Sequence, residues 1–205
     1  CSVYKETSGE KSTGKKELVV AADQDAVGLD PHSTPAASSV RIYSLIYERL
    51  VSMDSEMNLV PGLAEKWELS EDGKTITFNL RKDVKFHNGR ELTSEDVKYS
   101  FERILNPDTG STVASYFASV NAIETPDEST VVFKLNTPDA AFLTNTTASS
   151  ASIVPKEVED LVTEAVGTGP FMLEEMKSGQ YVTLKKNPDY THKDTIKYDS
   201  IRFNI

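Results

Sequence analysis

The sequence predicts an α/β protein in which a mixed or parallel β-sheet is accompanied by helices. Three observations support this prediction. Residues 18–22 (LVVAA) form a short continuous apolar run, typical of a strand buried on both faces of a mixed or parallel sheet. Residues 67–80 alternate between apolar and polar side chains around a turn, and residues 93–105 have helical spacing. Strands and helices therefore interleave along the chain, as an α/β fold requires.

A loop and a helix are expected after the first strand. Residues 23–35 are rich in Asp, Gly, Pro, Ser and Thr, which favour turns. Ser38 or Ser39 can cap the helix that follows. Its expected buried stripe comprises Ile42, Leu45, Ile46 and Leu50.

The most explicit local signals lie between Pro61 and Leu105. Trp67 and Leu69 alternate with polar neighbours, and the Asp72-Gly73 pair supplies the positive φ of a hairpin turn. The second strand of this hairpin presents Ile76, Phe78 and Leu80. A half-buried antiparallel hairpin is therefore expected here.

A helix is predicted directly after this hairpin. Thr93 and Asp96 have the spacing of a capping box, and Pro107 stops the helix. One helical face carries Val97, Phe101, Ile104 and Leu105.

The remaining elements are predicted from shorter patterns. Residues 131–135 (VVFKL) are expected to form a strand, and Pro155 to begin a helix that Gly167 ends. The inward face of that helix would carry Val158, Leu161, Val162 and Ala165. Residues 171–176 and 181–185 are predicted strands joined at Ser178-Gly179, and Ile201, Phe203 and Ile205 alternate in a last strand.

Composition excludes two classes of function. The chain of 205 residues has 38% hydrophobic and 26% charged residues, which is ordinary for a globular protein, and no apolar run of about 18 residues that would span a bilayer. Its net charge of −10 argues against nucleic acid as a partner, because phosphate contacts need clustered Lys and Arg. The same acidity also agrees with simple solubility of a secreted protein.

Catalytic and metal chemistry have little support in the sequence. The three histidines, His32, His87 and His192, lie far apart with no i,i+4 pairing, so no metal site is expected. There is no Walker loop, no nucleophile elbow and no CxxC pair. We therefore expect neither an enzyme nor a bound cofactor.

The order of motifs resembles that of family 5 bacterial extracellular solute-binding proteins, the peptide and nickel receptors of ABC importers. The segment from Pro61 to Ile104 is closely similar to their signature region. Leu29-Asp30-Pro31, a helix from Tyr43 to Leu50, Gly167 to Phe171 (GTGPF) and Asn187 to Tyr190 (NPDY) follow in the family's order. The resemblance covers the chain from about Leu18 onward.

This resemblance implies a division into domains. It implies the N-terminal lobe of a periplasmic binding protein type 2-like (cluster C) fold, in which residues 18–43 and 168–205 are parts of domain I. Residues 44–167 would form a small inserted α+β domain II. Full-length members carry a second, C-terminal lobe that closes over the ligand, and we expect that lobe to be absent from these 205 residues.

Cys1 and the residues after it have a separate explanation. Cys1 is the only cysteine, and residues 2–16 are polar, so residues 1–17 resemble the disordered tether of a bacterial lipoprotein lipidated on Cys1. The alternative is that Cys1 marks only where the sequence was cut.

Three segments are candidates for ligand contact. The resemblance implies that the loop from Ser33 to Ser38 lines the cleft, with Pro35 and Ala36 as the candidate residues. Tyr116 matches a position where the family places an aromatic hydroxyl, although a packing tyrosine is an equal alternative. Thr168 and Gly169 re-enter domain I, where Gly allows close backbone approach to a ligand, and the alternative is a plain turn.

The resemblance implies a lipid-anchored, monomeric receptor on the outer side of the cell membrane, which passes extracellular oligopeptides or dipeptides to ABC importer permease subunits. A nickel, metal-chelate or sugar receptor of the same family remains an alternative, as does a surface protein that acts as a sensor or interaction module. With half a cleft, the 205 residues alone are expected to bind peptide weakly or not at all.

Overall fold

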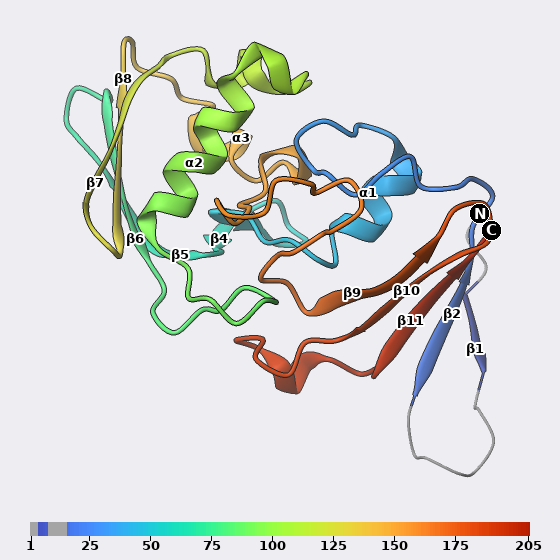
Figure 1. Cartoon of the computed structure of the whole chain (residues 1–205). Helices are drawn as coiled ribbons and strands as arrows, with labels where there is room; N and C mark the ends of the chain where they lie inside the picture. Colours follow the sequence, from blue (N-terminus) through green and yellow to red (C-terminus); the bar gives the residue numbers. More distant parts are fainter. Residues whose placement is uncertain (1–3, 8–15) are drawn as a thin grey trace.

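The computed structural model describes residues 4–7 and 16–205. Figure 1 shows two groups of elements, with a large sheet on one side and a smaller sheet carrying α2 on the other. The strands are β1 (Tyr4–Thr7), β2 (Glu17–Ala21), β3 (Val51–Met53), β4 (Leu59–Pro61), β5 (Ala64–Leu69), β6 (Thr75–Leu80), β7 (Val120–Asp127), β8 (Thr130–Leu135), β9 (Phe171–Lys177), β10 (Tyr181–Lys186) and β11 (Ser200–Asn204). The α-helices are α1 (Ala37–Tyr43), α2 (Ser94–Leu105) and α3 (Phe142–Asn145). Four 3₁₀ turns complete the described elements: η1 (Pro107–Thr109), η2 (Ala114–Phe117), η3 (Ser149–Ala151) and η4 (Lys193–Thr195).

The larger sheet has the strand order β1-β2-β11-β10-β9. Strand β2 runs parallel to β11, with Val20 opposite Phe203, and the other pairs are antiparallel. The predicted mixed sheet is therefore present. The prediction that residues 18–22 are buried on both faces is wrong, because only Val20 of this run is fully buried.

Strand β1 differs from the predicted tether. Residues 4–7 pair antiparallel with β2, from Tyr4 opposite Val20 to Thr7 opposite Glu17. The physical reason is that an edge strand offers unpaired N–H and C=O groups to any extended segment, whatever its side chains. Cys1 and residues 8–15 lie outside the described residues.

The smaller sheet has the order β5-β6-β8-β7 and contains the predicted hairpin. Gly73 has the positive φ of 69° at the turn, as the Asp72-Gly73 pair predicted. Strand β5 has a bulge between Ala64 and Lys66, and beyond it Trp67 lies opposite Phe78 and Leu69 opposite Ile76, so alternation is kept there. Leu69 is nevertheless 54% exposed at the end of the strand, so its predicted buried position is wrong. Helix α2 packs on β7 and β8, as predicted for the face with Val97 and Phe101.

A hydrophobic core lies between this sheet and α2, and we call it the aromatic core. Phe133 is its centre, with ring centroids 4.9 Å from Phe101, 5.4 Å from Phe78 and 5.3 Å from Phe142. Phe117 completes the ring cluster through Phe101 and Phe142. Such edge-on and tilted ring pairs add to the stabilisation from buried area.

A second core lies against the larger sheet, and we call it the mixed-sheet core. Strand residues Val20, Val182, Leu184, Ile201 and Phe203 supply one side. The opposite side comprises Leu29, Ile42, Tyr43, Ile46, Tyr47, Val154, Leu161 and Ala165. This core therefore draws on residues on both sides of positions 44 and 167, and the division into domains I and II remains a prediction.

Helix α1 is shorter and earlier than predicted. It begins after Ala36 and ends at Tyr43, so the expected helix from Tyr43 to Leu50 is wrong, and neither Ser38 nor Ser39 is its cap. The carbonyls of Leu45 and Ile46 instead accept from the amides of Phe171 and Gly169, at 3.1 and 2.8 Å. Long-range backbone pairing thus replaces the helical ladder beyond residue 43.

The helix predicted from Pro155 is also wrong, because residues 155–166 form turns. The Asp160 carboxylate accepts from the amides of Val162 and Thr163, and the Val162 carbonyl accepts from Leu29 N–H. A side chain that bonds nearby amides competes with helix formation. Leu161 and Ala165 are buried as predicted, whereas Val162 is exposed.

No helix in the described part of the chain, residues 4–7 and 16–205, is long and apolar enough to cross a membrane. The predicted strands at residues 131–135, 171–176 and 181–185 are present as β8, β9 and β10. The last predicted strand is β11, which ends one residue before Ile205.

Candidate functional site

The loop before α1 presents extended backbone at the surface. Pro35 is exposed, and Ala36 has φ −60° and ψ 129°. The Ala36 carbonyl accepts from Ser39 and Val40 at the start of α1, but no described residue pairs with the Pro35 carbonyl or the Ala36 amide. One acceptor and one donor of the main chain are therefore available to an extended ligand.

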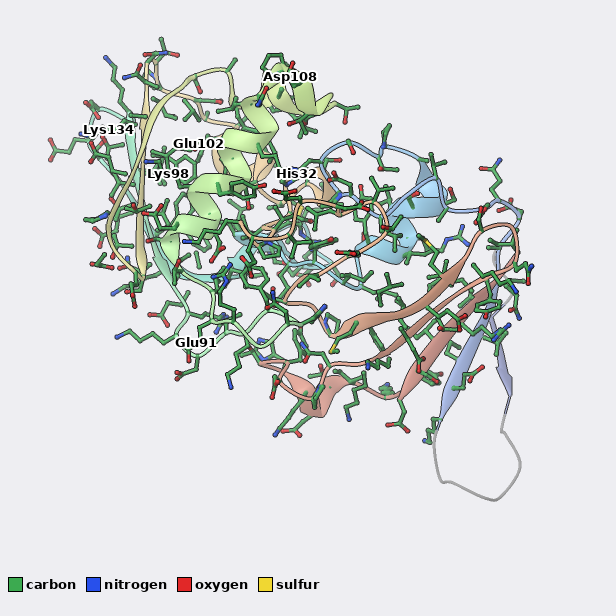
Figure 2. All side chains as sticks on the ribbon, viewed as in Figure 1. His32, Glu91, Lys98, Glu102, Asp108 and Lys134 are labelled. Carbon is green, nitrogen blue, oxygen red and sulfur yellow. The ribbon has the colours of Figure 1, made fainter. Side chains whose placement is uncertain are left out.

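A buried network holds the base of this loop, and Figure 2 labels one of its members, His32. The Arg103 guanidinium, from α2, donates to both carboxylate oxygens of Asp30 and, at 2.8 Å, to His32 Nδ1. Because arginine cannot accept, the proton of His32 lies on Nε2, which donates to the Ser152 carbonyl at 2.7 Å. Burial lowers the pKa of His32 to about 4, so the imidazole is neutral.

Tyr116 also lies at the surface. It belongs to η2 and its side chain is 52% exposed. Its carbonyl oxygen is 3.5 Å from Asn145 Nδ2, and Ser149 Oγ is 3.5 Å from Ser44 Oγ at the end of α1. Residues 145–152 therefore connect the surface around Tyr116 with the α1 region that adjoins Pro35 and Ala36.

A small cavity adjoins the same loop. It measures about 190 Å³ and lies at the carboxyl ends of the parallel strands β2 and β11, where Asp23 and Gln24 line it. Ser38 and Arg41 of α1 supply further polar side chains. Ligands of open α/β sheets bind at such strand ends, so this cavity extends the candidate surface.

Thr168 and Gly169 are placed differently from Pro35, Ala36 and Tyr116. Thr168 is only 2% exposed, and its hydroxyl donates to Glu48 Oε1 at 3.0 Å. Gly169 packs against the backbone of Ile46, where a Cβ atom would lie 2.6 Å from the carbonyl oxygen. The close approach that requires glycine is thus made by the chain itself, and a ligand role for these two residues remains a prediction.

His87 fixes the same crossover. Its Nδ1 accepts from the Gly167 amide at 3.2 Å, and its Nε2 donates to the Gly169 carbonyl at 3.0 Å. Burial lowers the pKa of His87 to about 4. His87 is therefore a neutral structural group, and its role was not evident from the sequence because its partners lie 80 residues away.

Glu48 is a second group that sequence reasoning missed. Burial raises its pKa to about 7, while the hydrogen bond from Thr168 and the charges of Arg49 and Arg81 oppose that rise. In the sequence Glu48 is an ordinary acidic residue, and its burial depends on the fold.

Among the described residues, no group of three or more His, Cys, Asp or Glu side chains could hold a metal ion.

Comparison with known proteins identifies the relatives of this chain. A di/tripeptide-binding protein of Pseudomonas aeruginosa is 33% identical, with 92% of this chain and 40% of that protein covered. The solved structure of the A. tumefaciens binding protein AgaA, in complex with agropinic acid, superposes with a TM-score of 0.86 at 34% identity and covers 92% of this chain and 39% of that one. The substrate-binding domain of a Bacillus anthracis oligopeptide ABC transporter gives a TM-score of 0.85 at 28% identity, with coverage of 95% and 42%.

The mixed sheet and these structural relatives define the class, which is that of the periplasmic binding proteins. More narrowly, the model of the bacterial extracellular solute-binding proteins, family 5, matches residues 58–205, and the chain belongs to this family. The chain spans about 40% of the length of the relatives it matches.

Proposed function

We propose that this chain is part of the substrate-binding component of an ABC importer that captures extracellular dipeptides or oligopeptides. It acts by binding and not by catalysis. The observation that favours a peptide is the extended backbone at Pro35 and Ala36, with an acceptor and a donor that no described residue uses. An extended peptide binds such a segment through main-chain hydrogen bonds, which leaves its side chains free to vary.

Tyr116 has a complementary role in this proposal. Its exposed ring lies on a surface that residues 145–152 connect to the α1 region. An aromatic side chain with a polar tip suits a site that contacts both apolar and polar ligand groups. Thr168 and Gly169 would act behind this surface, by holding the crossover in place.

The other wall of the cleft would come from a second lobe. The chain spans about 40% of its relatives' length, and such receptors close two lobes around the ligand. We propose domain I as residues 18–43 and 168–205, and domain II as residues 44–167. Contacts with importer permease subunits and a monomeric state belong to the same proposal.

Membrane attachment is a separate part of the proposal. Cys1 would carry acyl chains that anchor the receptor to the outer side of the cell membrane. The polar residues 2–16 would link Cys1 to β2, and residues 4–7 of this link pair with β2 as strand β1. Metabolic labelling with a fatty-acid analogue tests this, since label should appear in the natural protein and be lost in Cys1→Ser. Equal labelling of both proteins would contradict it.

The peptide proposal is tested with Ala36→Pro in the natural protein. Proline keeps the observed φ of −60° but removes the amide hydrogen. Loss of one main-chain hydrogen bond of about 1 kcal/mol should raise the dipeptide Kd by about fivefold. The matched control, Ala36→Ser, retains the N–H and should bind as the natural protein does.

Two results would contradict peptide capture by this surface. Either Ala36→Pro binds the same dipeptides with unchanged Kd in calorimetry, or mass spectrometry finds no peptide released from the purified natural protein. A single small ligand in that release, such as an opine, a sugar or a metal chelate, would favour the alternative receptor class. The agropinic acid complex of AgaA keeps that alternative open.

A sensor or interaction module is the remaining alternative from a different class. It predicts no released small ligand and a stable protein partner that copurifies with the natural protein. The importer proposal predicts release of small ligand and peptide-dependent association with permease subunits.

A further inference from the structure

A second cavity lies at the junction of the two cores, outside the surface described above. It measures about 200 Å³ and is lined by residues from separate segments, with Glu48 and Arg49 after α1, Ser52 in β3 and Tyr190 in the loop after β10. A water molecule occupies about 30 Å³ in the liquid. The cavity therefore has room for a small ion with a few waters.

Its charge is mainly positive. Arg49 is partly buried, and no described group accepts a hydrogen bond from its Nε atom. Arg81 does not line the cavity but contacts a residue that does, because its Nε donates to the Gly62 carbonyl at 2.7 Å. In the described part of the chain, neither arginine has a carboxylate oxygen within 4.0 Å.

An unpaired and partly buried guanidinium is costly, because it has lost water without gaining an acceptor. Burial also lowers the pKa of Arg49, because the charged guanidinium has lost part of its hydration. Arginine binds planar or tetrahedral oxyanions through several parallel N–H groups. The lining thus fits a ligand that supplies oxygen acceptors and negative charge.

Glu48 is the one carboxyl group among the described residues that line this cavity. Burial raises its pKa to about 7, against the effects of Thr168, Arg49 and Arg81. Tyr190 also lines the cavity, and its pKa is raised by burial and by the charge of Glu48. In its protonated form Glu48 does not repel an anion and can itself donate a hydrogen bond.

We propose that this cavity binds a small oxyanion between the Arg49 guanidinium and the Tyr190 hydroxyl, with Ser52 and protonated Glu48 as further donors. The oxyanion is either a free inorganic ion or the carboxylate of a bound ligand. The proposal does not depend on peptide capture, since it involves none of Pro35, Ala36 or Tyr116.

The first test is calorimetric titration of the natural protein with sulfate, at low millimolar concentration and with ionic strength matched by chloride. Sulfate keeps its charge between pH 6 and 8, so its own titration does not interfere. Arg49→Gln should weaken binding at least about tenfold, the loss expected for a charge-assisted hydrogen bond of 1.5–3 kcal/mol. Lys98→Gln, which removes an exposed cation of α2, should bind as the natural protein does.

Tyr190→Phe is a milder second variant in case Arg49→Gln does not fold. It removes one hydroxyl from the lining and should weaken sulfate binding severalfold, with an unchanged circular dichroism spectrum. Absence of sulfate binding by the natural protein, or equal binding by folded Arg49→Gln or Tyr190→Phe, would overturn the proposal.

The second test concerns pH. If the anion binds with Glu48 protonated, sulfate affinity of the natural protein should fall about tenfold from pH 6 to pH 8, because a group with a pKa near 7 loses most of its protonated form in that interval. Glu48→Gln keeps a neutral donor and should bind sulfate with little pH dependence. A natural protein whose affinity does not change between these pH values would remove Glu48 from the site.

Competition identifies the source of the oxyanion. A dipeptide with a free carboxyl terminus is compared with the same dipeptide amidated at that end. For each dipeptide, the displacement of sulfate from the natural protein is measured. Displacement by the free acid alone assigns the site to a ligand carboxylate, and displacement by neither assigns it to a free ion. Displacement by both forms would contradict recognition of an oxyanion.

Discussion

The two cores of this protein are built in different ways. The aromatic core lies between one antiparallel sheet and α2, which supply Phe78, Phe133 and Phe101 by regular spacing, while Phe117 and Phe142 come from the short elements η2 and α3. The mixed-sheet core combines parallel and antiparallel strands with irregular segments, including residues 44–47 and 154–165. Apolar periodicity thus accounts for the strand and helix residues of the first core, whereas the second depends on hydrogen bonds between distant segments of backbone.

The same difference separates the scaffold from the proposed binding surface. Pro35 and Ala36 lie beside the mixed-sheet core, and their loop is held by the Asp30, His32 and Arg103 network that reaches to α2. A rigid regular unit can position an irregular loop, and binding residues are often found on such loops. Four predictions test how far this contrast holds.

The largest effect is expected in the aromatic core. Phe133→Ala removes the central ring of the cluster and should lower the free energy of unfolding by about 3–5 kcal/mol, since neighbouring rings cannot close the cavity. Urea unfolding of the variant and of the natural sequence measures this change in the free energy of unfolding. Val132→Ala, on the opposite and partly exposed face of β8, is the matched control and should cost much less. Equal losses of unfolding free energy in Phe133→Ala and Val132→Ala would show that the ring cluster does not contribute more to stability than the partly exposed face of β8.

The second prediction concerns the link between the cores. Arg103→Gln leaves the Asp30 carboxylate buried without its ionic partner, and the free energy of unfolding should fall by about 3 kcal/mol. Lys98→Gln, which breaks an exposed i,i+4 pair on the same helix, should cost about 0.3 kcal/mol. If urea unfolding gives similar values for both variants, the buried network does not anchor the loop.

The third prediction tests the crossover. Gly169→Ala places a Cβ 2.6 Å from the Ile46 carbonyl oxygen, so the backbone must shift, at a cost of about 1–3 kcal/mol. Gly179→Ala is the control for backbone conformation without close packing. No atom lies within 4 Å of the Cβ that alanine would add there, so only the φ of 73° is unfavourable. Wild-type stability of Gly169→Ala would contradict the packing described for the crossover.

The fourth prediction is the pH dependence that His32 and His87 give to the free energy of unfolding. Each has a folded pKa of about 4 against the usual 6.5, so each stabilises the fold above pH 6.5 and that stability is lost as the pH falls toward 4. At pH 5 the loss is about 2 kcal/mol for each histidine. Urea midpoints across this range should fall, and less steeply in His32→Gln. An identical slope in that variant would show that His32 does not titrate as its burial requires.

Several elements could be predicted from the sequence because their signals are local. The hairpin of β5 and β6, the helix α2 and the strands β8 to β11 follow from alternation, a capping box and turn residues that act within a few positions. The family could be identified for the same reason, since its motifs are short and ordered.

Other elements could not be predicted, because distant partners override local preference. Residues 44–50 have helical apolar spacing, yet the carbonyls of Leu45 and Ile46 pair with residues 169–171. Residues 155–165 likewise carry an apolar stripe, but Asp160 and Leu29 bind the amides and carbonyl that a helix would use. Such competition appears only when the chain is folded.

The sequence by itself determined the family, the mixed sheet and the position of the loop with Pro35 and Ala36, because periodicity, turn residues and motif order are properties of neighbouring residues. The tertiary structure decided which groups are buried and with what partner. Tertiary contacts made His87 a neutral imidazole bonded to the backbone of Gly167 and Gly169. They also raised the pKa of Glu48 to about 7 and placed Arg49 in a polar cavity. Burial and the electrostatics that follow from it depend on residues far apart in the chain, and no local pattern contains them.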